Sequence, residues 1–289
     1  MAFGSLDEVL GICKEEGLPF WKVILRDDTN ERNVSEEESL RQMEELWDAM
    51  LLAASLYDEK EQSNSRLVGG AGGKMQAYVE KGDTLSGPFM GKVIAGALQM
   101  GESNACMKRI VAAPTAGACG VLPAVLVPYF MEKKADARQI TEALYVAAGI
   151  GQVIALRASI AGASGGCQAE IGTASAMAAG AMVHLKGGSA WQIAQASAMA
   201  LKNLLGLVCD PVAGLVEVPC VKRNVVGAVN ALAAADMALA GIESRIPPDQ
   251  VFDAMKEIGD RMTSDLKETG QGGLAGTPAG REIAERIGR

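Results

Sequence analysis

The stretch IGTASAMAAGAMVHLKGGSAWQIAQASAMALKNLL, residues 171–205, indicates what kind of fold this chain adopts. Two runs rich in Ala, Met and Leu are separated by Gly187-Gly188. The glycine pair is typical of a helix end, and Ser189-Ala190-Trp191-Gln192 is a capping box that begins the next helix. Because both helices are apolar on most sides, we expect them to be buried inside a domain.

The same pattern continues on both sides of this stretch. Strand signals are scarce, since a β-branched run such as Val121–Val127 contains a proline and fits a buried helix equally well. Thr277-Pro278 fits an N-cap followed by proline at the first helical position. We therefore expect an all-α, Ala/Gly-rich helical domain with buried central helices. The helices are expected near 88–101, 120–133, 138–160, 171–186, 189–205, 224–241, 248–261 and 278–287.

The first part of the chain is less regular. A charged loop is expected from Arg26 to Asn33, and the capping box Ser35-Glu36-Glu37-Glu38 then predicts a helix that runs to about Glu61. Residues 67–73 are glycine-rich, but no Gly-Lys-Ser/Thr follows, so we reject a nucleotide-binding loop. We expect one catalytic domain over residues 1–289, with residues 1–65 as a possible peripheral helical cap.

Composition excludes several classes of protein. The 289 residues are 49% apolar but only 4% aromatic, and the formal net charge is −8, which argues against a nucleic-acid partner. The acidic start Met1–Glu8 does not look like a signal peptide. Gln152 and Arg157 interrupt the longest apolar run, which makes a membrane span unlikely in a chain that we expect to be cytoplasmic.

Three cysteines lie in short stretches punctuated by glycine or proline. They are Cys167 after Gly165-Gly166, Cys209 in Cys-Asp-Pro-Val-Ala-Gly, and Cys220 in Val-Pro-Cys-Val-Lys-Arg-Asn. Thiolates at such breaks between helices could converge on one metal centre, and three of them would leave a fourth position open for substrate. Spacing alone leaves this open, because cysteine is often a small buried hydrophobe and no C-x-x-C pair occurs here.

These stretches, together with Ala113–Gly120 and Leu85-Ser86-Gly87-Pro88, closely resemble the alpha chain of bacterial iron–sulfur-dependent L-serine dehydratase. The resemblance runs from about Gly69 to about Arg281. It implies a [4Fe-4S] cluster held by Cys167, Cys209 and Cys220 at loop–helix junctions. It also implies a lyase that converts L-serine to pyruvate and ammonia at an open iron. Pyridoxal phosphate is not expected, because neither a Schiff-base lysine nor an α/β fold is indicated.

Other polar residues are weaker candidates, and the general base is not identified. Cys119 is expected to be a packed thiol, Cys13 and Cys106 carry no motif, and His184 is expected to pack within its helix. Hydroxyl groups, backbone amides and cations in glycine-rich loops could contact the serine substrate. These candidates are Lys74, Thr115, Gly117, Ser164, Gly165 and Arg223.

The resemblance also predicts a partner. The family places a His-containing, serine-rich segment near the active site, in its beta portion, and this sequence has no such segment, so we expect a separate beta subunit. Single-chain relatives use a C-terminal tail cysteine as a resting fourth ligand, and this sequence ends without one. Two alternatives stay open: a related iron–sulfur lyase that acts on L-cysteine, and a non-catalytic helical subunit.

Overall fold

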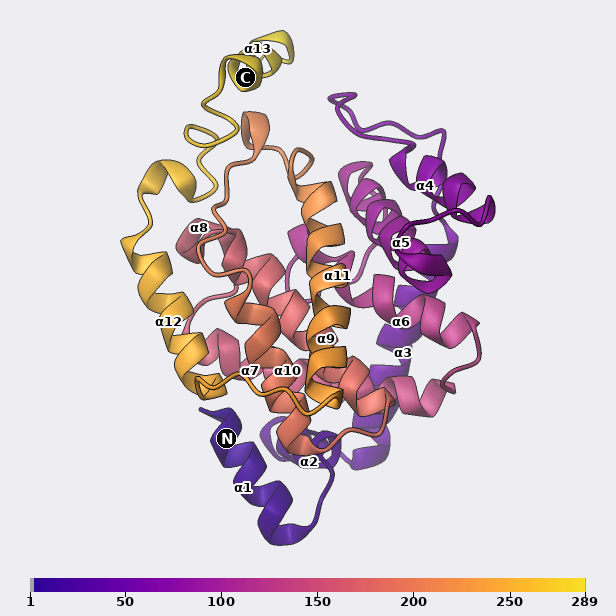
Figure 1. The fold of residues 1–289 in the computed structure, drawn as a ribbon, viewed down its shortest axis with the longest axis vertical. Coiled ribbons are helices and arrows are strands. Elements are labelled where there is room, and N and C mark those ends of the chain that lie inside the picture. The colour runs from indigo at the N-terminus through magenta and orange to yellow at the C-terminus, as the bar shows by residue number, and fades with distance from the viewer. Residues whose placement is uncertain (1–2, 289) are drawn as a thin grey trace.

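The chain folds entirely into helices, as a computed structural model that describes residues 3–288 shows (Figure 1). Within those residues there is no strand, and the one β-type contact is an isolated bridge between Cys209 and Lys267. The all-α prediction is confirmed. The α-helices are α1 (Leu6–Glu16), α2 (Phe20–Arg32), α3 (Glu36–Ser55), α4 (Ala71–Glu80), α5 (Gly87–Ala105), α6 (Val121–Met131), α7 (Ala137–Arg157), α8 (Gly162–Gly165), α9 (Thr173–Leu185), α10 (Ala190–Lys202), α11 (Cys220–Leu239), α12 (Pro248–Arg261) and α13 (Pro278–Arg286).

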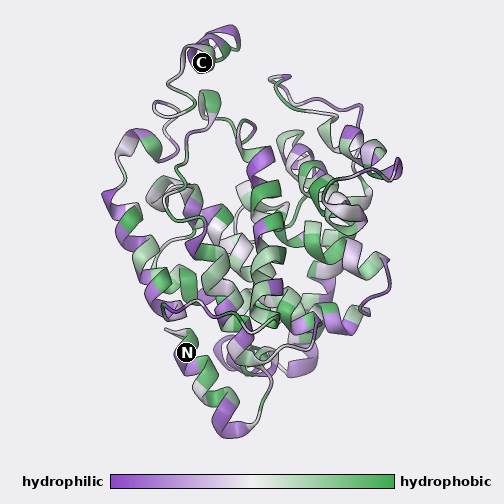
Figure 2. Cartoon of the chain, viewed as in Figure 1, coloured by the Kyte–Doolittle hydropathy of each residue, from purple (hydrophilic) through white to green (hydrophobic). Residues whose placement is uncertain are grey.

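Helix α9 lies at the centre of the molecule. Every residue from Thr173 to Val183 is buried, and the helix packs against α6, α7, α10 and α11. Hydrophilic residues, drawn in purple, are most frequent in outer segments such as α12 and α13, and the central helices are mostly green or pale (Figure 2). The predicted buried central helices are therefore present, and α9 is buried on all sides because its sequence offers no polar face.

Small residues let these central helices approach closely. A Cβ atom built on Gly180 of α9 would lie only 2.2 Å from Ile150 Cδ1 on α7. Similarly, a Cβ on Gly101 of α5 would lie 3.1 Å from the Cα of Val221 on α11. Burial in this protein thus depends on short distances between helix axes rather than on large side chains.

Several predicted helix starts are present. Ser189 and Gln192 form the complete capping box at the start of α10, and Thr277 accepts a hydrogen bond from the Gly280 amide at the start of α13. Ser35 accepts from the Glu38 amide and so begins α3. From α5 onward the predicted boundaries agree with the structure to within about four residues.

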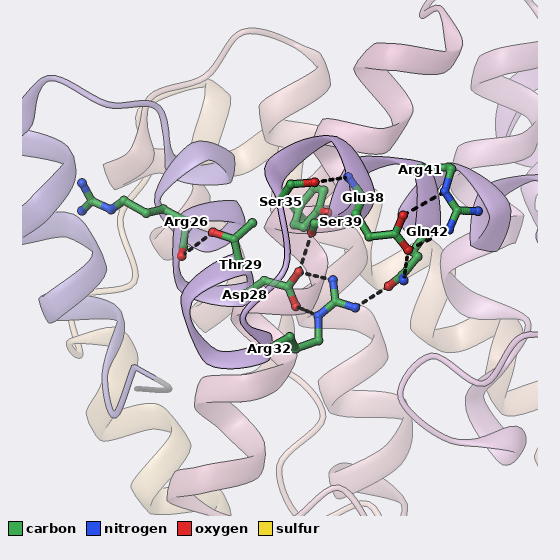
Figure 3. Close-up of polar contacts among 10 residues, drawn as sticks. Arg26, Asp28, Thr29, Arg32, Ser35, Glu38, Ser39, Arg41 and Gln42 are labelled. Atoms are coloured by element: carbon green, nitrogen blue, oxygen red, sulfur yellow. Dashed lines mark hydrogen bonds and ion pairs between the residues drawn. The ribbon is translucent and has the colours of Figure 1, made fainter.

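The prediction of a charged loop from Arg26 to Asn33 is wrong, because α2 continues to Arg32. Asn33 caps the end of the helix in a left-handed conformation. Arg32 binds Asp28 one turn earlier, with Nη2 2.6 Å from Oδ2, and Asp28 also accepts a hydrogen bond from Ser39 on α3 (Figure 3). Charged pairs at i,i+4 support a helix whose other face is buried. The buried face carries Val23 and Ile24.

The region around the glycine-rich segment also differs from expectation. Helix α3 ends at Ser55 rather than near Glu61, and α4 was not predicted. The buried carboxylate of Glu102 on α5 accepts hydrogen bonds from the amides of Ala71 (2.8 Å) and Gly72 (3.0 Å). An acid from a distant element therefore caps α4, and it occupies the position where a phosphate-binding loop would bind its anion.

Among the described helices, only α7 is long and apolar enough to cross a membrane, and 67% of its most apolar window is buried inside the fold. Helices α2 and α3 pack along α7, and Phe20 and Trp47 belong to the central hydrophobic core. The description of residues 1–65 as a peripheral cap stays a prediction.

Candidate metal centre

The three predicted ligands all lie at junctions between helices and irregular segments. Cys167 follows the short helix α8 and precedes a π-helical turn, Gln168–Gly172. Cys209 lies in the segment between α10 and α11, and Cys220 is the first residue of α11. All three thiols are buried, with at most 7% of each residue exposed.

Two of these cysteines meet a carboxylate that the sequence did not single out. The ligand atoms of Cys167, Glu170 and Cys209 all lie within 4.8 Å of one another. Glu170 projects from the π-helical turn, an irregularity that is frequent at functional sites. The available signal was that Glu170 is the only charged residue between Ala169 and Val183.

The thiols differ in how readily they ionise. A hydrogen bond from Cys209 lowers the pKa of Cys167 and, because it keeps the proton on Cys209, raises the pKa of that residue. The nearby Arg223 guanidinium also lowers the pKa of Cys167. Burial raises the pKa of Cys220 to about 12, and the charge of Cys167 adds to that effect. Cys220 is thus close to Cys167 but outside the tight group with Glu170.

The Arg223 guanidinium has three partners within the site. Its Nη1 donates to the Val208 carbonyl at 2.8 Å and lies 3.5 Å from Cys167 Sγ. Its Nη2 lies 2.8 Å from Oδ1 of Asp210, and the two side chains are 13% and 4% exposed. The guanidinium therefore joins the Cys167 turn to the Cys209-Asp210 segment.

Backbone hydrogen bonds hold Cys209 against the C-terminal part of the chain. Its amide donates to the Leu266 carbonyl at 2.8 Å, and its carbonyl accepts from the Glu268 amide at 2.7 Å. Asp210 extends this contact, because its Oδ2 accepts from the Leu274 amide at 2.8 Å. Segment 264–274 thus fixes the position of the second cysteine.

The buried side-chain amide of Asn224 fixes the position of Cys220. Its Nδ2 donates to the carbonyls of Cys220 (3.0 Å) and Gly117 (2.9 Å), and its Oδ1 accepts from the Gly120 amide at 2.8 Å. Asn224 therefore ties the turn at Thr115–Gly120 to the start of α11.

Thr115 and Gly117 face Glu170. Thr115 Oγ1 donates to Glu170 Oε1 at 2.6 Å, and a Cβ on Gly117 would lie 3.1 Å from the same oxygen. Burial raises the pKa of the Glu170 carboxyl, the Thr115 hydrogen bond opposes that effect, and the negative charge of Glu268 adds to it.

The donor set suits a thiophilic metal group. A Cβ atom on Gly162 would lie 2.8 Å from Glu170 Oε2 and 3.0 Å from Cys209 Sγ, so any other residue there would crowd both groups. Soft thiolate donors are the ligands that iron–sulfur clusters use. The residues present therefore fit such a group.

The remaining predicted residues lie elsewhere. Ser164 and Gly165 line a separate pocket of about 240 Å³ against α12. Lys74 is exposed on α4, which packs against α5. Within the described residues, Lys74 makes no contact with the three cysteines. Cys119 is fully buried 3.7 Å from the Met100 carbonyl, and partly buried His184 lies 3.6 Å from Glu142.

Fold and site together define an all-helical protein with a group of two buried thiols and one carboxylate that could hold a metal ion. Residues 15–275 match the family described as "Serine dehydratase alpha chain", and the chain belongs to that family.

Individual relatives agree with this assignment. The chain is 47% identical to the "Probable L-serine dehydratase, alpha chain" of Bacillus subtilis, across 99% of this chain and 95% of that protein. It is 41% identical to the "L-serine dehydratase, alpha chain" of Peptoniphilus asaccharolyticus, across 96% and 95%. Its similarity to "L-serine dehydratase 2" of Escherichia coli is 46% identity across 62% of this chain and 40% of that protein.

Proposed function

We propose that this chain is the alpha chain of an L-serine dehydratase, a lyase that converts L-serine to pyruvate and ammonia. Membership of the serine dehydratase alpha chain family carries this proposal, since the family match covers residues 15–275. The meeting of Cys167, Cys209 and Glu170 in one buried site supports it.

Cys167, Cys209 and Cys220 would hold a [4Fe-4S] cluster. When bound, the cluster supplies a Lewis acid that stabilises negative charge as the carbon–oxygen bond of serine breaks. The Cys167 thiol gives up its proton to a metal more readily than an ordinary cysteine, because the hydrogen bond from Cys209 and the charge of Arg223 lower its pKa. The low exposure of the three cysteines keeps water away from the sulfurs.

The residues around the cysteines would bind and orient L-serine. The Thr115 hydroxyl and the backbone at Gly117 lie beside Glu170 and can offer hydrogen bonds to the substrate. Ser164, Gly165 and Lys74 stay predictions, because they lie away from this group. For Arg223 we propose a positioning role, since Cys167, Val208 and Asp210 already engage its guanidinium.

We also propose a separate beta chain as partner and a cytoplasmic location. The names of the Bacillus and Peptoniphilus relatives include "alpha chain", and the match with the Escherichia coli protein covers only 40% of it. The rest of such an enzyme would come from another chain here.

A single anaerobic experiment tests the function. The chain is reconstituted with ferrous iron and sulfide, mixed with its beta partner, and assayed for pyruvate from L-serine and for hydrogen sulfide from L-cysteine. We expect pyruvate from serine. Sulfide release without pyruvate would favour the cysteine lyase, and a chain that never binds stoichiometric iron would favour a non-catalytic helical subunit.

A further inference from the structure

We propose that Glu170 is a fourth protein ligand of the metal centre, bound through its carboxylate when substrate is absent. This inference rests on the proposed function, because it assumes that the three cysteines bind an iron–sulfur cluster. It goes beyond that function by giving the open coordination position to a residue of this chain.

Position is the first reason. The Glu170 carboxylate lies within 4.8 Å of both Cys167 Sγ and Cys209 Sγ, close enough for the three groups to hold one metal ion. The carboxylate comes from the same short segment as Cys167, one turn further along the chain. The π-helical turn that carries it is widened relative to an α-helix, and this irregularity sets the direction of the side chain.

The second reason is the incomplete set of partners around this carboxylate. An ionised carboxylate offers about four lone-pair sites. Within residues 3–288 the hydrogen bond from Thr115 Oγ1 to Oε1 is the one that reaches it. The guanidinium of Arg223, which contacts Cys167, is directed to Cys167, Val208 and Asp210 instead. A half-buried carboxylate without a cation costs free energy unless something positive binds it.

The third reason is how closely two glycines approach this carboxylate. A Cβ atom on Gly162 would crowd Oε2 and Cys209 Sγ, and a Cβ atom on Gly117 would crowd Oε1, so both positions keep side chains away from the group. Thr115 meanwhile fixes the orientation of the carboxylate, as outer hydrogen-bond partners of ligating carboxylates do. A candidate ligand and the donor that orients it are therefore both present.

The experiment detects whether a water molecule is bound to the iron. The complete enzyme is reduced anaerobically to its paramagnetic state in water enriched in oxygen-17, without substrate, and its electron paramagnetic resonance lines are recorded. If Glu170 occupies the fourth position, the wild-type lines are not broadened by oxygen-17. Broadening appears in Glu170→Gln, because water replaces the carboxylate, and addition of L-serine changes the wild-type spectrum.

Two further variants sharpen the result. Glu268→Gln removes a neighbouring exposed carboxylate and should leave the narrow wild-type lines unchanged. Thr115→Val removes only the hydrogen bond to Glu170, and we expect a loss of iron affinity of about 10–100-fold. Oxygen-17 broadening in the wild-type enzyme itself would refute the Glu170 assignment while leaving the three-cysteine cluster intact. A wild-type enzyme without iron would refute both proposals, and the wild-type measurement does not depend on any variant folding.

Discussion

Cys167 differs from the other cysteines because its surroundings favour its thiolate form. Cys209 donates a hydrogen bond to the Cys167 sulfur, and Arg223 places a positive charge 3.5 Å from the same atom. Burial, in contrast, raises the pKa of Cys220 to about 12. A metal that binds all three sulfurs releases the protons that these thiols carry, so its affinity should increase with pH.

Replacing any of the three ligands should abolish cluster assembly. We expect Cys167→Ala, Cys209→Ala and Cys220→Ala to lose the broad visible absorbance and the bound iron after anaerobic reconstitution, because each removes one of three sulfur ligands. Cys13→Ala and Cys106→Ala are the matched controls, since these thiols are half-buried and outside the site. Equal iron loss in the controls would contradict the ligand assignment.

Arg223 should matter for structure as well as for the metal. Arg223→Met leaves the Asp210 carboxylate, which is 4% exposed, without its cationic partner. Removing one partner of a buried pair typically costs about 3–5 kcal/mol, so we expect a clear fall in the free energy of unfolding together with weaker iron binding. The adjacent, exposed Lys222→Met is the control and should change neither quantity measurably.

His184 should report on stability rather than turnover. Burial lowers its pKa below 6.5, although Glu142 opposes this effect. The folded state therefore favours the neutral ring. The stability that depends on it is present above the unfolded-state pKa of roughly 6.5 and is lost as the pH falls through the folded-state pKa.

The measurement is thermal unfolding of the wild type and of His184→Gln between pH 8 and pH 5. The wild type should lose more stability than the variant as the pH falls, and pyruvate formation at pH 8 should be similar in both. A large fall in the turnover number of a stable variant would show a catalytic role instead.

Among the helices, α9 has the least room for change. Gly180→Val adds a branched side chain where a single Cβ would already lie 2.2 Å from Ile150, so we expect a loss of about 1–3 kcal/mol in the free energy of unfolding.

Gly11→Ala in α1 is the opposite case, because nothing lies within 4 Å of its added Cβ. It should stabilise the protein by about 0.5–1 kcal/mol. Chemical denaturation of both variants tests the pair.

The sequence predicted helices where local signals and burial agree, and it failed where a distant residue supplies the stabilising contact. Ser189 and Gln192 cap α10 within a single turn, so their pattern sufficed. Helix α4 depends on Glu102, which is 31 residues from Ala71. The cysteine loops could be recognised as sequence motifs. The contact between Glu170 and Cys209, however, depends on how separate segments pack, and the spacing of residues along the chain does not predict that packing.

At the level of the assembled enzyme, the chain alone should hold iron but turn over L-serine slowly. A positioned acid–base group contributes about 10²–10⁴-fold in rate, and we expect the beta chain to supply it. Adding the beta chain to the reconstituted alpha chain should therefore raise the rate by about that factor. Full activity of the alpha chain alone would contradict the two-chain proposal, and the base would then be sought near Lys74 and Ser164.

Oxygen should inactivate the enzyme. An iron that substrate can reach is also the iron most easily lost on oxidation, so exposure to air should remove activity, and ferrous iron with a thiol should restore it. The measurement is pyruvate formation before and after aeration, with iron content determined in parallel. Unchanged activity after aeration and chelation would argue against a catalytic cluster.

The contacts between Cys209 and segment 264–274 have a consequence for biosynthesis. Leu274, whose amide holds Asp210, is translated 65 residues after Cys209. At about 5–20 residues per second, the ribosome needs roughly 3–13 seconds to cover that distance. Through most of this interval the nascent chain already has Cys167, Cys209 and Cys220 but not the complete segment that positions Cys209. Cluster delivery in the cell should therefore follow the completion of translation rather than accompany it.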